Sequence, residues 1–152
     1  MGRRLRVVEP STEEVVRAYL TAAQTGDLDG LSRLRHPEWT EEWPQSGELV
    51  RGDANDRAIS EHYPGGLPTL DTIRIVGSED RWVVTPSYTV QRVVGSGDSW
   101  WADVKVIYRD GSTWFAAKLL ELRDATIYRE TTYWAEAFEP PAWRARWVER
   151  LG

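Results

Sequence analysis

Apolar residues recur three and four positions apart in the first third of the chain, a spacing typical of helices with one buried face. A first helix is predicted after Ser11, which can form a capping box with Glu14. Gly26 can end this helix in the left-handed conformation, and Asp27 can cap a second helix. That helix should end at His36-Pro37, because a residue before proline avoids the helical region.

A strand is expected around residues 38–43 and a third helix over residues 53–63. From residue 67 onward the pattern changes to apolar–polar alternation, interrupted by turn residues at regular intervals. The expected turns are Gly77-Ser78, Gly95–Asp98, Asp110-Gly111 and Asp124-Ala125. Helices followed by a strand meander predict one α+β domain over residues 1–152, with three N-terminal helices packed on a curved, mainly antiparallel sheet.

The two faces of this sheet follow from the assumed turns. A turn centred on Ser96-Gly97 and a two-residue turn at Asp110-Gly111 make Asp103 and Lys118 direct cross-strand neighbours. Both would then lie on the face that lines a cavity, so they predict an acid–base pair inside that cavity. A slip of one residue in either turn would reverse the assignment, because side chains alternate with a period of two.

The opposite face is too apolar to be left in water, and the helices can cover only one side of the sheet. We therefore predict a homodimer through this outer face. Its expected members are Trp100, Val104, Val106, Tyr108, Phe115 and Leu119.

The orientation of the last strand has two solutions. If Trp134 faces the cavity, Glu130, Thr132 and Glu136 face it too; this solution is preferred. If Asp124-Ala125 is a tight two-residue turn, Tyr133 faces inward instead.

The composition argues against several classes of function. A formal charge of −5 argues against nucleic-acid binding, and no apolar run has the length that would predict a membrane partner. The absence of cysteine favours a cytoplasmic location. Two distant histidines without cysteine predict no metal site, and no cofactor motif is present. Nine tryptophans and six tyrosines suit a core or the walls of a ligand cavity.

The order of motifs resembles the nuclear transport factor 2-like superfamily and its SnoaL-like branch. The resemblance rests on TGDLDGL between the first two helices, VRG before the third, and the closing run RDATIYRETTYWAEAFEPPAW. It implies a cone of helices and curved sheet around an apolar cavity, and dimerisation through the outer face of the sheet. It does not fix an activity, since one fold hosts many chemistries.

Individual activities of the superfamily can be compared residue by residue. The ketosteroid isomerase pattern matches at Tyr19, but its base position falls on Trp43 and its acid position on Lys118. The limonene epoxide hydrolase constellation lacks its arginine. The polyketide cyclases of the SnoaL-like branch resemble this chain best, with Asp103 or Glu136 as the cavity carboxylate.

We therefore expect a protein that binds a small, largely apolar metabolite and possesses the groups for acid/base isomerisation or cyclisation of a carbonyl compound. The alternative is a non-catalytic ligand-binding or protein-interaction module of the same fold. The candidate catalytic residues are Asp103, Lys118 and Tyr19. The candidate ligand-binding residues are Trp39, Trp43, Tyr63, Tyr88, Trp101, Lys105, Trp134 and Glu136, while Glu41 and Glu42 are expected to face solvent.

Overall fold

The structure is a computed structural model that describes residues 8–66, 83–84 and 88–151, with the backbone alone for residues 83–84, 88–92, 94 and 96. The expected turn at Gly77-Ser78 and the side chain of Tyr88 lie outside the described part. The described residues form three α-helices: α1 (Thr12–Thr25), α2 (Leu28–Leu34) and α3 (Asp53–Glu61). The predicted ranges of the helices are therefore confirmed to within a few residues.

The capping box predicted at the start of α1 is present. The backbone N–H of Glu14 donates to Ser11 Oγ at 3.2 Å, and the backbone N–H of Ser11 donates to Glu14 Oε2 at 3.0 Å. Gly26 ends the helix with φ of +66°, and the Asp27 side chain accepts from the backbone N–H of Gly30 at 2.9 Å to start α2. Local sequence therefore decides where both helices begin and end.

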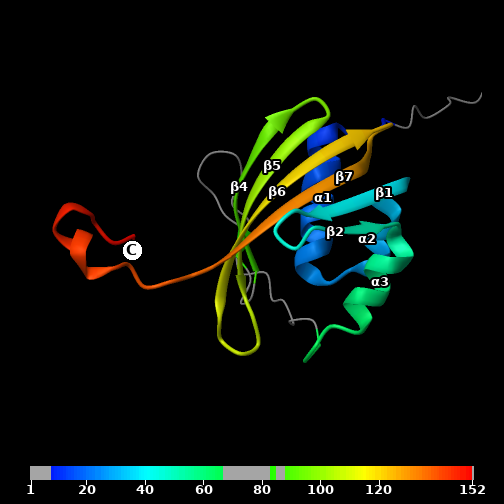
Figure 1. Cartoon of the computed structure of the whole chain (residues 1–152). Helices are drawn as coiled ribbons and strands as arrows, with labels where there is room; N and C mark the ends of the chain where they lie inside the picture. Colours follow the sequence, from blue (N-terminus) through cyan, green and yellow to red (C-terminus); the bar gives the residue numbers. More distant parts are fainter. Residues whose placement is uncertain (1–7, 67–82, 85–87, 152) are drawn as a thin grey trace, which may run out of the picture.

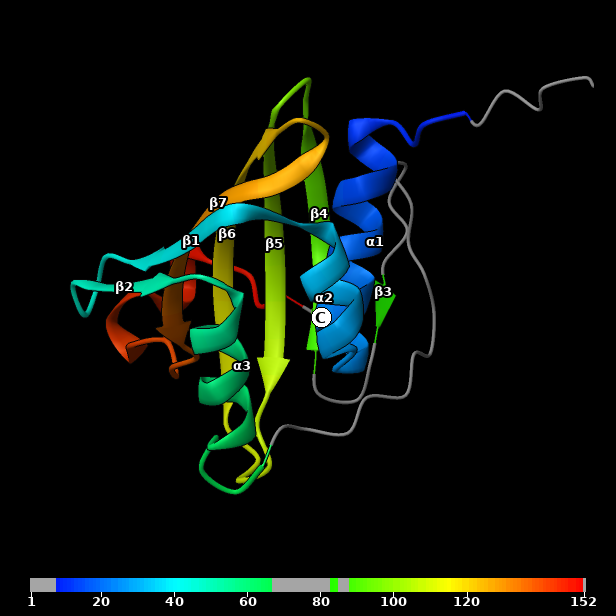
Figure 2. The same cartoon turned by 90° about the vertical axis from the view of Figure 1, so that its right-hand side faces the viewer.

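The strands of the sheet are β1 (Arg35–Trp43), β2 (Glu48–Arg51), β3 (Val83–Val84), β4 (Tyr88–Ser96), β5 (Ser99–Ile107), β6 (Thr113–Arg123) and β7 (Thr126–Glu136). Their order is β2-β1-β7-β6-β5-β4-β3, in which only the β1–β7 pair is parallel. The sheet is curved, and all three helices lie on one side of it (Figures 1 and 2). This arrangement confirms the α+β fold with helices on one face of a curved sheet, which stays open.

The core lies between the helices and the inner face of the sheet. Val16 and Tyr19 of α1 are 0% and 2% exposed, and they pack in one cluster with buried strand residues such as Val104, Leu120 and Ile127. Burial of each such side chain contributes about 1.5–3 kcal/mol. Two observations therefore identify the inner face of the sheet: its side chains are buried, and the helices lie on that side.

The turn between β5 and β6 differs from the prediction. The last paired residues are Ile107 and Thr113, the backbone N–H of Gly111 donates to the carbonyl of Tyr108, and that of Tyr108 donates to the carbonyl of Ser112. Gly111 has φ of +85°. These features define a three-residue loop with glycine in a bulge, rather than the two-residue turn that Asp-Gly suggested. The register is shifted by one residue as a result.

This shift reverses every side chain of β5. Asp103 pairs with Ala117 instead of Lys118, and Trp101 and Lys105 lie with it on the outer face. The predicted Asp103–Lys118 pair is therefore wrong. The predicted outer face is wrong at four positions, because Val104 and Val106 are buried in the core, Trp100 packs against it and Tyr108 lines a cavity. Phe115 and Leu119 are on the outer face as expected, 40% and 37% exposed.

The turn between β6 and β7 is the tight two-residue turn at Asp124-Ala125 that was expected to turn Tyr133 inward. Trp134 nevertheless faces inward, as in the preferred orientation. Asp124 and Ala125 both have positive φ, and Arg123 pairs with Thr126. The register then shifts between Glu121 and Leu122, so that one extra residue of β7 restores the other parity. Tyr133 is 47% exposed on the outer face. The preferred orientation is confirmed, by way of a bulge that no sequence motif marked.

Beyond β7 the chain leaves the domain. Residues 138–151 form an extended arm that ends in a short 3-10 helix, η1 (Ala142–Trp147), on the side of the sheet opposite the helices (Figure 1). Within the described part of the chain, no helix has both the length and the apolar character needed to cross a membrane.

Candidate functional site

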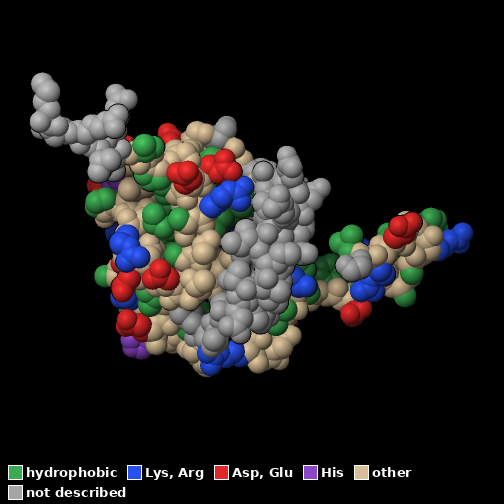
Figure 3. Space-filling model, turned by 180° about the vertical axis from the view of Figure 1, so that it is seen from behind, with side chains coloured by type: hydrophobic (Ala, Val, Ile, Leu, Met, Phe, Trp, Pro, Cys, Tyr) green, Lys and Arg blue, Asp and Glu red, His purple; other side chains and the backbone are tan. Residues whose placement is uncertain are grey.

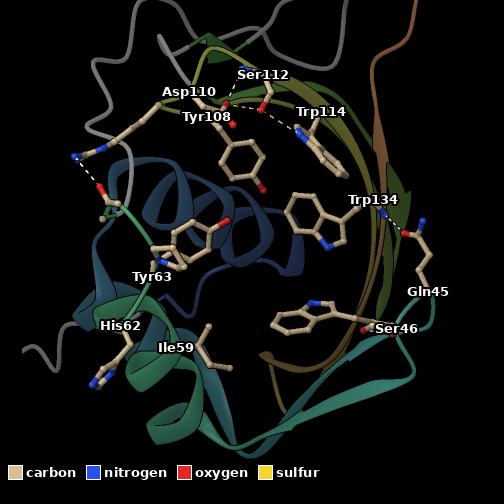
Figure 4. A pocket seen from close by; sticks show the side chains of 15 residues that line it. Gln45, Ser46, Ile59, His62, Tyr63, Tyr108, Asp110, Ser112, Trp114 and Trp134 are labelled. Atoms are coloured by element: carbon tan, nitrogen blue, oxygen red, sulfur yellow. Dashed lines mark hydrogen bonds between the residues drawn. The ribbon is translucent and has the colours of Figure 1, made fainter.

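A cavity of about 1070 Å³ opens at the end of the sheet where the β5–β6 loop, the β1–β2 loop and the C-terminal end of α3 meet. Aromatic side chains form most of its walls: Trp43 from β1, Tyr63 after α3, Tyr108 and Trp114 from the β5–β6 hairpin, and Trp134 from β7. Figure 4 shows the rings of Tyr63, Tyr108, Trp114 and Trp134 pointing into the same space. A cavity of this size can enclose a small organic molecule.

The rings hold one another in place. Tyr63 and Tyr108 are parallel with centroids 6.4 Å apart, and Tyr108 meets Trp114 edge to face at 6.2 Å. The indole N–H of Trp114 donates to Ser112 Oγ at 3.3 Å, and Asp110 accepts from both donors of Ser112. These contacts pre-organise the aromatic walls.

His62 also lines this rim (Figure 4). Its Nδ1 lies 2.7 Å from the carbonyl oxygen of Ala58, so Nδ1 carries the proton in that contact. The cavity therefore has an imidazole at its edge, held by the end of its own helix.

A cluster of charged and polar side chains is buried on the same inner face of the sheet. At its centre is Glu130 of β7, 1% exposed. Its Oε1 accepts hydrogen bonds from the hydroxyl of Tyr19 and from the indole N–H of Trp39, the latter at 2.9 Å. Its Oε2 lies 3.4 Å from Lys118 Nζ. Three donors from three elements therefore surround one buried carboxyl group.

Glu41 of β1 is the second buried carboxylate. It is 6% exposed, its Oε1 accepts from Thr132 Oγ1 at 2.7 Å, and the same oxygen lies 3.7 Å from Lys118 Nζ. Glu41 and Glu130 are also register partners in the parallel β1–β7 pair. Lys118 therefore joins two acids on adjacent strands, and one ammonium group cannot neutralise both.

This arrangement shifts the pKa of Glu130. Burial and the nearby Glu41 carboxylate raise the pKa, and Lys118, Arg35 and the Tyr19 hydrogen bond only partly oppose that rise. Tyr19 and Trp39 occupy Oε1, so a proton on Glu130 would be carried by Oε2, on the side of Lys118. A carboxyl group whose pKa is moved toward neutrality is suited to proton transfer.

The hydroxyl of Tyr19 has a fixed orientation. Arg35 Nε donates to the Tyr19 oxygen at 2.8 Å, and a guanidinium has no acceptor, so the single hydroxyl proton points to Glu130. Burial, followed by the charge of Glu130, raises the pKa of Tyr19, which keeps the phenol protonated. Tyr19 is therefore a permanent hydrogen-bond donor to the acid.

Arg35 connects this cluster to the helices. Its NH1 and NH2 groups contact Asp53 Oδ1 at 2.7 Å and Asp56 Oδ2 at 2.9 Å in the first turn of α3, and its guanidinium stacks 3.7 Å from the centroid of the Trp39 ring. Burial alone would lower the pKa of Arg35, but Tyr19, Glu130 and Asp56 together raise it. The arginine is therefore a permanently charged anchor between α1, β1 and α3.

The cluster lies below the aromatic cavity. Along β1 the inward residues are Trp39, Glu41 and Trp43, and along β7 they are Glu130, Thr132 and Trp134. Only the last of each series lines the cavity, and alternate residues of a strand are about 7 Å apart. Glu41 and Glu130 are therefore the next inward residues to Trp43 and Trp134 on the same strands, and neither is among the described residues that line the cavity.

The predicted site residues divide between the two faces. Trp43, Tyr63 and Trp134 line the cavity, while Tyr19, Lys118 and Trp39 belong to the cluster beneath it. Asp103, Trp101 and Lys105 lie on the outer face, where the Trp101 indole N–H donates to Asp103 Oδ1 at 2.8 Å, and Glu136 is exposed at the end of β7. The catalytic position of Asp103 in the cone is therefore excluded, because the β5 register turns it outward.

Glu130 was expected to face the cavity together with Trp134, but Glu130, Glu41 and Arg35 were not among the predicted site residues. Glu41 was expected in solvent, and it is buried because it alternates with two inward tryptophans on β1. The same period-two reasoning from Trp134 places Glu130 inward on β7. No group of three or more histidine, cysteine, aspartate or glutamate side chains that could hold a metal ion occurs in the described ranges.

No protein-family model and no curated protein matches this sequence. Solved structures do match. An NTF-2 like protein of unknown function from Burkholderia xenovorans is 27% identical, with 93% of this chain and 95% of that chain covered at a TM-score of 0.72. A Kribbella flavida protein that is proposed to be a ketosteroid isomerase is 24% identical, with 93% and 90% covered at a TM-score of 0.68.

An LEH-like epoxide hydrolase of M. tuberculosis is similar in fold at 14% identity, with 82% of each chain covered and a TM-score of 0.58. The three similarities extend over most of the described helices and strands, and they agree with the fold implied by the sequence motifs. The chain is therefore a member of the nuclear transport factor 2-like superfamily.

Proposed function

We propose that this protein binds a small, largely apolar carbonyl compound in its aromatic cavity and catalyses acid/base isomerisation or cyclisation, as in the SnoaL-like branch. Glu130 is the proton-transfer group, in place of Asp103. Tyr19 and Lys118 hold its carboxyl group and compensate the charge that forms on it. Among the similar structures are an epoxide hydrolase and a protein proposed to be a ketosteroid isomerase, which is in line with an enzyme.

The observation that carries this proposal is the environment of Glu130. It is a buried carboxyl group with a raised pKa, a second acid beside it and a lysine within 3.4 Å. A structural ion pair needs only one acid for one base. The second buried acid leaves a proton in the cluster that can be exchanged as the pH changes.

An experiment that needs no known substrate is hydrogen exchange at carbon. A catalytic acid/base group that acts next to a carbonyl exchanges α-protons for deuterium in D₂O. We expect 2-tetralone, a flat and apolar ketone, to exchange faster with the protein than in buffer, with a bell-shaped dependence on pH. Mass spectrometry of the recovered ketone measures the rate.

Glu130→Gln keeps an oxygen for Tyr19 and Trp39 but cannot take up a proton. It should reduce the enzymatic exchange rate by about 10²–10⁴-fold while ketone binding persists. Asp103→Asn on the outer face is the matched control and should leave the rate unchanged. Exchange that is equal in protein and buffer, or that survives in Glu130→Gln, would exclude Glu130 as the catalytic group.

A second function, non-catalytic ligand binding, is favoured by one observation. Neither Glu41 nor Glu130 is among the described residues that line the cavity, whereas Trp43 and Trp134, the next inward residues on the same strands, are. Binding of 2-tetralone with unchanged affinity in Glu130→Gln, together with no exchange in the wild-type chain, would establish this alternative.

We also propose a homodimer through the corrected outer face. Four large side chains are exposed there although they lie in the centre of the sheet: Trp101 at 36%, Phe115 at 40%, Leu119 at 37% and Tyr133 at 47%. An apolar patch of this kind is typical of an interface. Leu119→Asp should convert a dimer to a monomer in light scattering, whereas Leu49→Asp on the distant edge strand β2 should not.

A further inference from the structure

The C-terminal arm, residues 138–151, stands apart from the described part of its own chain (Figure 1). Phe138, Trp143 and Trp147 are 77%, 73% and 67% exposed. Each hydrogen bond, ion pair and ring contact shown for arm side chains in the described part has both partners within the arm, such as Arg150 with Glu139 at 3.6 Å and Arg146 over the Trp147 ring at 4.7 Å. Figures 1 and 3 show the arm standing clear of the body.

The chain cannot easily fold the arm back. The ladder between β6 and β7 continues to the backbone N–H of Ala137, which donates to the carbonyl of Thr113. Pro140 and Pro141 follow at once, and Pro141 has φ of −64° and ψ of 138°, an extended geometry. Consecutive prolines act as a stiff spacer. The arm is therefore directed away from its own sheet.

The arm lies on the side of the sheet opposite the helices, which is the side of the exposed outer face (Figure 1). One chain thus carries two uncovered apolar surfaces on one side, the arm and the outer face. A second copy placed against the outer face would lie where the arm is. In a dimer with two-fold symmetry, the arm of each copy would pack against the other copy.

The sizes fit such an exchange. A buried aromatic side chain covers about 150–250 Å², so the three arm aromatics can bury roughly 450 Å² per arm and about 900 Å² for two arms. A standard stable interface buries about 1,600 Å², so the two arms would supply more than half of it and the outer faces would supply the rest. The charges fit as well. The arm, residues 138–151, carries three arginines and two glutamates, a net charge of +1, whereas the whole chain has a formal charge of −5.

We infer that the C-terminal arm is an exchanged clasp, in which Trp143 and Trp147 of each copy dock on the sheet surface of a second copy of this chain. This inference rests on the proposed dimer through the outer face. The clasp adds a second contact to that dimer. It is made by the C-terminal arm, which a dimer through the sheet faces alone would not need.

The chain contains no cysteine, so one introduced thiol is unique. Ala145→Cys lies between the two tryptophans, and benzophenone-maleimide attached there cross-links its neighbours on illumination. The experiment mixes ¹⁵N-labelled and unlabelled full-length protein and identifies cross-linked peptides by mass spectrometry. We expect mixed-isotope products that join the arm of one chain to residues 99–136 of another.

The second measurement is the dimer dissociation constant from sedimentation. Trp143→Ala with Trp147→Ala should raise that constant at least about tenfold, as expected for interface aromatics. Val8→Ala, 88% exposed at the other end of the described chain, should leave it unchanged. A dimer with unchanged affinity in the double variant would overturn the clasp and leave the sheet interface standing. Cross-links only within one chain would also overturn it, and a monomeric wild-type chain would overturn both.

Discussion

Lys118 on β6 and Glu130 on β7 form an ion pair inside the domain, with Nζ 3.4 Å from Oε2 and side-chain exposures of 12% and 2%. The same ammonium group lies 3.7 Å from Glu41. Taking these charges out of water costs several kcal/mol per ion, which the pairing must offset. A domain that keeps one lysine and two acids at its centre therefore holds a proton equilibrium there.

Lys118→Met should destabilise the protein by about 3–5 kcal/mol at pH 7, because two buried carboxylates then face each other with their shared cation removed. Chemical denaturation in urea measures the change in the free energy of unfolding. Lys105→Met, which removes a lysine from the outer face of the neighbouring strand, is the matched control and should change it by less than about 0.5 kcal/mol. Equal effects of the two substitutions would mean that the buried cluster contributes no special charge balance.

Glu130→Gln should change how stability depends on pH. The folded-state pKa of Glu130 is raised above the ordinary value of 4.5, so above that pH the native state binds more protons than the unfolded state. The stability contributed by the protonated form is therefore present below pH 4.5 and is lost as the pH rises through the folded pKa. In Glu130→Gln this loss should be absent.

Urea denaturation of both proteins between pH 4 and pH 9 measures that difference. Glu42→Gln removes a charge from an exposed position of β1 and serves as the control, with an expected change within about 0.5 kcal/mol. Parallel stability curves for wild type and Glu130→Gln over the whole range would contradict a raised pKa.

Arg35→Lys should destabilise the protein by about 2–3 kcal/mol, since lysine cannot reach Asp53, Asp56 and Tyr19 at once or stack as a plane on Trp39. Thermal and urea unfolding followed by circular dichroism measure the loss. Arg33→Lys, with an exposed side chain 3.9 Å from Asp27, should cost under about 0.5 kcal/mol. A cost for Arg35→Lys as small as this would show that the guanidinium fork is not required.

Trp134→Ala should weaken binding of the apolar fluorophore 8-anilinonaphthalene-1-sulfonate at least about tenfold, because it removes one wall of the cavity. Fluorescence titration measures the dissociation constant. Trp101→Ala deletes the same side chain from the opposite face of the sheet and should leave affinity within about twofold. A larger loss in Trp101→Ala than in Trp134→Ala would place the dye on the outer face.

The sequence by itself determined the helices and the class of fold. The capping box at Ser11, the left-handed Gly26 and the cap at Asp27 act through neighbours a few residues away, so their outcome can be read locally. The motif order also pointed to the superfamily, and the alternation on β1, β6 and β7 held Trp43, Lys118 and Trp134 on the inner face.

Only the tertiary structure decided which carboxylate shares that face with Lys118. One glycine bulge after Asp110 and one extra residue near Tyr128 each shift a register by one position, and a shift of one moves a whole strand to the other face. Asp103 is turned outward for this reason, and Glu130 takes its place. The parallel contact between β1 and β7, which brings Glu41 to Glu130, joins segments about ninety residues apart and has no signature in either.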